Sequence, residues 1–163
     1  MIEAARKTLI SAAALIALGL GTAQADIAAA DKLFAEGNHK DALQAYVDAG
    51  GEGDVEATYR AAEMFETGQG TGGPKMDKAA SWYQAAARAG HLGALNKLAE
   101  MFNEGRGVEQ DKVQAWTLLN IAAQRGDTDA AARRDQIAAD LRPGQIAAGE
   151  RRTEKLASKY QGS

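Results

Sequence analysis

Apolar side chains recur in the middle of the chain at the spacing of an α-helix. Ala57 is followed by Ala61, Met64 and Phe65, at intervals that place all four side chains on one helix face. Polar residues fill most positions between them. The same arrangement returns 37 residues later, at Ala94, Leu98, Met101 and Phe102. The pattern predicts two amphipathic helices of the same design.

These two helices belong to a longer internal repeat. Residues 62–70 match residues 99–107 at six of nine positions, and Ala79, Ala86, Ala87 and Gly90 return 36 residues further on. Gly68 and Gly105 follow the two helices, where a helix end favours the positive φ of glycine. Internal repeats of 20–50 residues with helical spacing are typical of solenoids. The sequence therefore predicts an all-α fold, an α/α superhelix of about four antiparallel helix pairs.

The repeat divides the chain into units. Residues 54–90 and 91–126 form the two well-matched copies, and residues 26–53 form a degenerate tetratricopeptide-like unit with a shorter turn. Residues 127–163 are expected to form C-terminal capping helices, with Pro143 in the first turn of the last one. Polar terminal units of this kind keep a solenoid soluble.

Residues 1–25 have the pattern of a secretory signal peptide. Arg6 and Lys7 precede an apolar run from Leu9 to Leu20, and the small residues Ala23 and Ala25 provide a cleavage signal. The apolar run is shorter than the ~20 residues that cross a bilayer. We therefore expect cleavage after Ala25, a periplasmic or secreted protein, and no stable membrane insertion after cleavage.

Composition narrows the classes of partner. The chain is 45% apolar and 25% charged, with no cysteine and a net charge of −3, which becomes −4 when residues 1–25 are removed. Binding to nucleic acid depends on clustered Lys and Arg that neutralise phosphates. A mildly acidic chain of mixed charge is thus not expected to bind nucleic acid.

No pattern in the sequence indicates catalysis. The segment 68–73 matches the G-x-G-x-x-G dinucleotide motif, but it follows a helix and precedes Pro74, whereas the motif requires a strand before it. His39 and His91 lack metal-ligand spacing, and His91 is expected near a helix start. We predict no catalytic residue, no cofactor and no metal site. Trp82 aligns with Leu118 and is expected in the core, whereas the environment of Trp116 stays open.

The repeated residues resemble a known family. The first helices read Ala-x-x-x-Ala/Leu-Ala-x-x-Phe-x-x-Gly-x-Gly from Ala57 and from Ala94, and the second helices share small residues and a final glycine; together they resemble the Sel-one-like repeat. This resemblance covers residues 54–126. The resemblance implies that this chain forms an α/α superhelix and acts as an adaptor. Bacterial members of the family are often exported and often tether signalling or envelope-assembly proteins.

A candidate binding strip lies opposite the buried stripe of the first helices. In tetratricopeptide-like stacks the first helix of each pair lines the concave side, so polar residues there are candidates for contact with a partner protein or peptide. An aromatic side chain on such a face suits an interface. We predict that this polar strip binds a partner segment of basic character, through Tyr59, Glu63, Glu66, Asn96, Glu100 and Asn103.

Three other interpretations remain open at this stage. A solvated face that binds nothing is the more common explanation for such polar residues, and Tyr59 is the reason to prefer an interface. A second possibility is an envelope enzyme or small-ligand binder, with a glycan or β-lactam as the substrate class, which would require a closed pocket with a perturbed titratable group. A third is an accessory subunit that acts only within a larger complex.

Overall fold

The computed structural model describes residues 22–160, which form eight α-helices and a short terminal 3-10 helix, with no strand among them. The predicted all-α class is confirmed. Of the predicted signal peptide, residues 1–21 lie outside the described part of the chain. The helices are α1 (Thr22–Ala35), α2 (His39–Gly51), α3 (Val55–Thr67), α4 (Met76–Arg88), α5 (Leu92–Glu104), α6 (Lys112–Gln124), α7 (Thr128–Ala138) and α8 (Pro143–Leu156), followed by η2 (Ala157–Tyr160).

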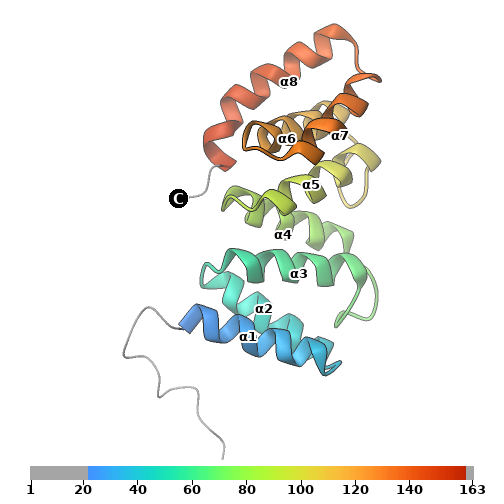
Figure 1. Ribbon diagram of the computed structural model, residues 1–163. Coiled ribbons are helices and arrows are strands. Elements are labelled where there is room, and N and C mark those ends of the chain that lie inside the picture. The colour runs from blue at the N-terminus through green and yellow to red at the C-terminus, as the bar shows by residue number, and fades with distance from the viewer. Residues whose placement is uncertain (1–21, 161–163) are drawn as a thin grey trace, which may run out of the picture.

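The helices stack in chain order into one elongated array (Figure 1). α1 packs on α2, α3 on α4 and α5 on α6, and each pair contacts the next through its second helix. In Figure 1, α1, α3, α5 and α7 lie toward the viewer and α2, α4 and α6 lie behind them. The predicted solenoid of helix pairs is therefore confirmed. Among the described residues, no helix combines the length and apolar character that a membrane crossing requires.

The second, third and fourth pairs begin with the same kind of helix cap. The side chains of Asp54, His91 and Asp127, spaced 37 and 36 residues apart, each accept a hydrogen bond from the backbone N–H three residues later. Such caps satisfy backbone donors that a helix start leaves without partners. His91 performs this role with Nδ1, 3.1 Å from the Ala94 nitrogen. Its predicted position at a helix start is confirmed.

The core is a seam of small residues with a few larger side chains. Ala57, Ala61, Ala94 and many other alanines are fully buried, so neighbouring helices approach closely. Larger side chains fill the space between pairs; the biggest that are fully buried include Tyr83, Leu95, Leu98, Met101, Leu118 and Leu119. The repeated apolar stripe thus becomes the contact between successive helices.

The glycine loops set the distance between units. Gly70 has φ +79°, and a Cβ added there would lie 2.5 Å from the carbonyl oxygen of His39. Gly107 has φ +70°, and its Cβ would lie 2.3 Å from the carbonyl oxygen of Met76. His39 and Met76 both begin the second helix of the preceding unit, and they are also 37 residues apart. The second glycine of each loop therefore allows a backbone contact that holds one unit against the last.

The last two helices do not pack against each other as the earlier pairs do. α8 packs against α6 rather than against α7. On α7, Arg134 and Asp135 stand 36 residues after Leu98 and Ala99, which are buried core residues in α5. Charged side chains are costly to bury. The face of α7 that carries Arg134 and Asp135 is therefore unsuited to pack against α8. α8 instead places Gly149 directly on the ring of Trp116, where a Cβ would lie 2.6 Å from Cε3.

The structure corrects the expectation for Trp82 and settles the environment of Trp116, which the sequence left open. Trp82, expected in the core, is only partly buried, whereas Trp116 is 6% exposed. The Trp82 ring lies over Gly50 and 6.0 Å from the Phe65 ring, measured between centroids for the two aromatic rings. The indole thus packs against Gly50 and Phe65 at the edge of the core, whereas Leu118 at the matching position is fully buried.

Candidate functional site

The six residues of the predicted strip lie together on α3 and α5, and all of them are partly buried. We call the side of the stack formed by α1, α3, α5 and α7 the first-helix face. The strip forms its middle part, consisting of Tyr59, Glu63, Glu66, Asn96, Glu100 and Asn103. The contacts of each residue determine what the strip offers to a partner.

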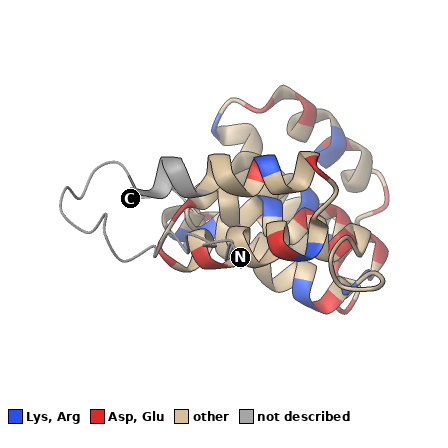
Figure 2. Cartoon of the chain, turned by 90° about the horizontal axis from the view of Figure 1, so that it is seen from below, with Lys and Arg blue, Asp and Glu red and all other residues tan. Residues whose placement is uncertain are grey.

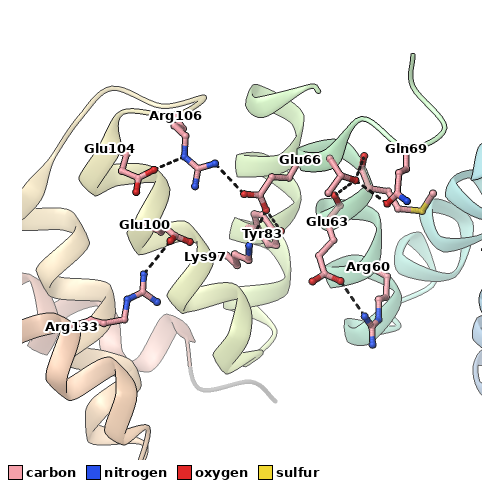
Figure 3. A network of polar contacts seen from close by, with 12 residues as sticks. Arg60, Glu63, Glu66, Gln69, Tyr83, Lys97, Glu100, Glu104, Arg106 and Arg133 are labelled. Atoms are coloured by element: carbon pink, nitrogen blue, oxygen red, sulfur yellow. Dashed lines mark hydrogen bonds and ion pairs between the residues drawn. The ribbon is translucent and has the colours of Figure 1, made fainter. Parts of the chain in front are cut away.

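Glu66 is the centre of a polar cluster between two repeats (Figure 3). Its carboxylate accepts hydrogen bonds from Tyr83 Oη at 2.6 Å, Lys97 Nζ at 3.2 Å and Arg106 Nη1 at 3.2 Å. Burial acts to raise the pKa of Glu66, but these three donors outweigh it and lower the pKa below its usual value. Burial and the same carboxylate raise the pKa of Tyr83. Glu66 therefore links α3, α4 and α5, and its side chain is only 12% exposed.

Tyr59 is engaged in an aromatic stack. Its ring lies parallel to that of His91, with centroids 4.2 Å apart, and 5.6 Å from the ring of Tyr83. Burial and the neighbouring Glu63 raise the pKa of Tyr59 to about 12. Because His91 Nδ1 accepts a backbone hydrogen bond, the proton of the neutral ring lies on Nε2, which faces Glu56 at 3.1 Å. Tyr59 thus supports the contact between two repeats as well as bordering the surface.

The two other glutamates of the strip have basic partners. Glu63 pairs with Arg60 on the same helix at 3.2 Å, and Glu100 lies 3.8 Å from Arg133 on α7 (Figure 3). All four side chains are between a third and a half exposed. Ion pairs at this exposure add little stability but hold charges of both signs at defined places.

The two asparagines contribute differently. Asn96 Nδ2 donates to Asp127 Oδ2 at 2.6 Å, which ties α5 to the cap of α7. Asn103 accepts a hydrogen bond from Gln110 Nε2 through its backbone carbonyl, at 2.7 Å. The side chain of Asn103 therefore remains on the face near the loop that follows α5.

The sequence analysis missed the basic residues of this face. Arg60, Lys97 and Arg133 are spaced 37 and 36 residues apart, so α3, α5 and α7 each carry one base at the same repeat position. That recurrence is visible in the sequence and was the signal that could have identified them. Acidic and basic positions are interspersed along the helices (Figure 2). The strip is consequently mixed in charge rather than acidic, and it does not by itself account for a preference for basic partners.

The glycine-rich motif that the sequence analysis considered for nucleotide binding forms a turn between two helices. Residues 68–73 form the loop between α3 and α4, with φ +83° at Gly68, which caps α3. In residues 22–160, no three side chains of His, Cys, Asp or Glu lie close enough to hold a metal ion.

Comparisons with known proteins agree with this geometry. The Sel1 repeat model matches residues 55–91 and 93–127, whereas no curated protein matches. A solved structure of c5321, a protective antigen of uropathogenic Escherichia coli with an SLR fold, is 26% identical with a TM-score of 0.79, over 86% of this chain and 31% of that one. A Sel1 repeat protein from Oxalobacter formigenes is 27% identical with a TM-score of 0.64, over 69% of this chain and 48% of that one.

The chain therefore spans less than half the length of either structural neighbour. Both neighbours share the helical solenoid with this chain. In this chain the two matched repeats lie in the middle of the solenoid, from α3 to α6. Sel1 repeat proteins are in general helical modules for protein–protein interaction. The chain thus contains two Sel1 repeats, which lie in the middle of a solenoid of helix pairs.

Proposed function

We propose that this protein is an exported adaptor that binds a segment of a partner protein along a concave first-helix face, in envelope signalling or assembly. The observation that carries the proposal is the row of partly buried polar side chains that crosses α3 and α5. These side chains are held in place by contacts between repeats, such as the three hydrogen bonds to Glu66. Fixed side chains lose little conformational freedom on binding, which favours affinity.

Export is supported by the sequence of residues 1–25. The basic start, the apolar run and the small residues before Asp26 have the order of a signal peptide. Helix α1 begins at Thr22, so cleavage after Ala25 would start the mature chain within the first turn of that helix. We accordingly place the mature protein in the periplasm or outside the cell.

The buried tyrosines are suited to a structural role in this proposal. Burial and hydrogen bonds to carboxylates raise the pKa of Tyr46 and that of Tyr83. A raised pKa makes the phenolate harder to form, which opposes use of either tyrosine as a base or nucleophile near neutral pH. Both hydroxyl groups donate to acids of the first helices, so these tyrosines serve the rigidity of the first-helix face.

The proposal can be tested by photo-crosslinking in the native envelope. A photoreactive amino acid would replace Asn103 on the first-helix face or, as a control, exposed Ser81 on α4. We expect one discrete crosslinked partner from position 103 and none from position 81. Crosslinks of equal yield from both positions, or from position 81 alone, would show that the binding face is wrong.

A further inference from the structure

The first-helix face contains a recess between α1 and α3. It has a volume of about 480 Å³ and is bordered by both apolar and charged side chains. The rings of Phe34 and Tyr46 and the thioether of Met64 form apolar walls, while Asp31, Arg60 and Glu63 supply charge. Asp31 is exposed, so its carboxylate can be reached from solvent.

The next seam along the stack, between α3 and α5, shows how similar groups combine when a cation is present. There Tyr83 holds the carboxylate of Glu66, and the space beside it is occupied by Lys97 and Arg106 (Figure 3). Arg106 reaches this carboxylate from the loop after α5 and also binds Glu104, at 2.6 Å. In this seam a carboxylate that accepts a hydrogen bond from a tyrosine also accepts one from a guanidinium group.

The first seam repeats the tyrosine and again pairs it with a carboxylate, but this carboxylate belongs to Asp31, whereas Ala29 stands 37 residues before Glu66, and the cation of the loop is not repeated. Tyr46 stands 37 residues before Tyr83 and donates a hydrogen bond to Asp31 at 2.5 Å. Gln69 stands 37 residues before Arg106, but it is neutral, and its Oε1 lies 3.0 Å from Thr67 Oγ1 in its own unit. No counterpart of the Arg106 guanidinium is supplied from this position.

Arg60 does not fill this role either. It stands 37 residues before Lys97, yet its guanidinium pairs with two acids of its own helix, Glu56 at 2.9 Å and Glu63 at 3.2 Å. The recess itself is lined by two carboxylates, those of Asp31 and Glu63, and by this one guanidinium group. The recess therefore has an excess of negative charge together with apolar walls.

We propose that the recess binds an arginine side chain of the partner protein. The guanidinium would lie by Asp31 and Glu63, as that of Arg106 lies by Glu66, and the aliphatic stem would lie along Phe34 and Met64. Planar guanidinium groups bind carboxylates with two parallel hydrogen bonds, which favours arginine over lysine. This inference rests on the proposed partner binding. It assigns the preference for a basic partner segment to this recess, which shares only Glu63 with the candidate strip.

The test uses NMR of the ¹⁵N-labelled mature chain with two small probes, N-acetyl-arginine amide and its neutral isostere N-acetyl-citrulline amide. We expect the arginine probe to shift the amide signals of Phe34, Thr67 and Gln69 with millimolar affinity, and the citrulline probe to leave them unchanged. Asp31→Asn should weaken the arginine probe at least fivefold. Gln69→Arg should block it, because the new side chain would fill the recess as Arg106 fills the next seam.

A matched control is Glu104→Gln, which changes the carboxylate beside Arg106 and should leave probe binding unchanged. Equal shifts with both probes, or undiminished binding to the Gln69→Arg variant, would overturn the inference. The two proposals fail separately. A partner crosslinked from position 103 without arginine selectivity refutes only the recess, whereas arginine binding without any crosslinked partner refutes only the adaptor function.

Discussion

Replacement of Gly70 by alanine should loosen the contact between the first two units. The residue has φ +79°, and its new Cβ would lie 2.5 Å from the carbonyl oxygen of His39 and 3.0 Å from its carbonyl carbon. Both atoms belong to the backbone at the start of α2, so they cannot rotate away as a side chain would. Gly72 provides a control in the same loop, because it has φ +73° and nothing within 4 Å of its Cβ position.

The expected loss follows from two terms. A left-handed backbone costs an L-residue about 1–2 kcal/mol, and the lower entropy of the unfolded alanine chain returns about 0.4–1 kcal/mol. Gly72→Ala should therefore reduce the free energy of unfolding by about 1 kcal/mol. Gly70→Ala carries the same cost and also an overlap with backbone, worth about 1–3 kcal/mol more.

Urea denaturation followed by circular dichroism at 222 nm measures both variants. A difference of about 2 kcal/mol between them corresponds to a difference of about 1 M in midpoint for a typical slope of about 2 kcal/mol/M. We expect Gly70→Ala to unfold at the lower urea concentration. Equal midpoints for the two variants would refute the role of Gly70 as a spacer between units.

Three further changes have expected outcomes. Gly149→Ala should lower the free energy of unfolding by about 1–3 kcal/mol and shift Trp116 fluorescence to the red, because the new Cβ would lie 2.6 Å from that ring. The control Gly144→Ala lies in open space on the same helix and should raise the free energy of unfolding by up to about 1 kcal/mol in the same denaturation assay. Glu66→Gln should cost about 1–2 kcal/mol at pH 7. Since the folded pKa of Glu66 is lowered, this loss should be complete above the unfolded pKa of about 4.3 and shrink as the pH falls through the folded value; a loss independent of pH between 7 and 3 would contradict the cluster. Glu100→Gln should change the free energy of unfolding by less than about 1 kcal/mol, since its pair with Arg133 is exposed, and a larger loss by thermal denaturation would refute that estimate.

The repeat made the fold accessible from sequence. Ala57 and Ala94 mark the same buried position in two copies, so each copy supports the interpretation of the other. Gly68 and Gly105 were expected to end helices with positive φ, and both do so. Local signals sufficed here because, in a solenoid, each unit contacts only its neighbours.

The packing of the last helix was not accessible in the same way. The sequence predicted that Pro143 begins a final helix, which is confirmed. It did not indicate that α8 would seat on Trp116 through Gly149, because that contact joins residues 33 positions apart with no repeat partner. The charges of Arg134 and Asp135 explain the change only once their positions beside the core are known.

The charge of the candidate strip was also incomplete. Its acids were selected from the face of the first helices, whereas some of their bases reach them from other elements, as Arg106 does from a loop and Arg133 from α7. Side-chain reach across a seam depends on the distance between helices, which an amphipathic pattern does not contain. The recurring bases Arg60, Lys97 and Arg133 could have been read from the sequence, but the approach of Arg106 to Glu66 from its loop could not.

Cysteine labelling in the native envelope tests the central claim most directly. The chain contains no cysteine, so Asn103→Cys and Ser81→Cys each report on a single position. The rate of labelling by a maleimide would be compared between cells and purified protein. A partner on the first-helix face should slow labelling of position 103 in cells several-fold and leave position 81 unchanged. Equal rates at position 103 in cells and in purified protein would contradict the account.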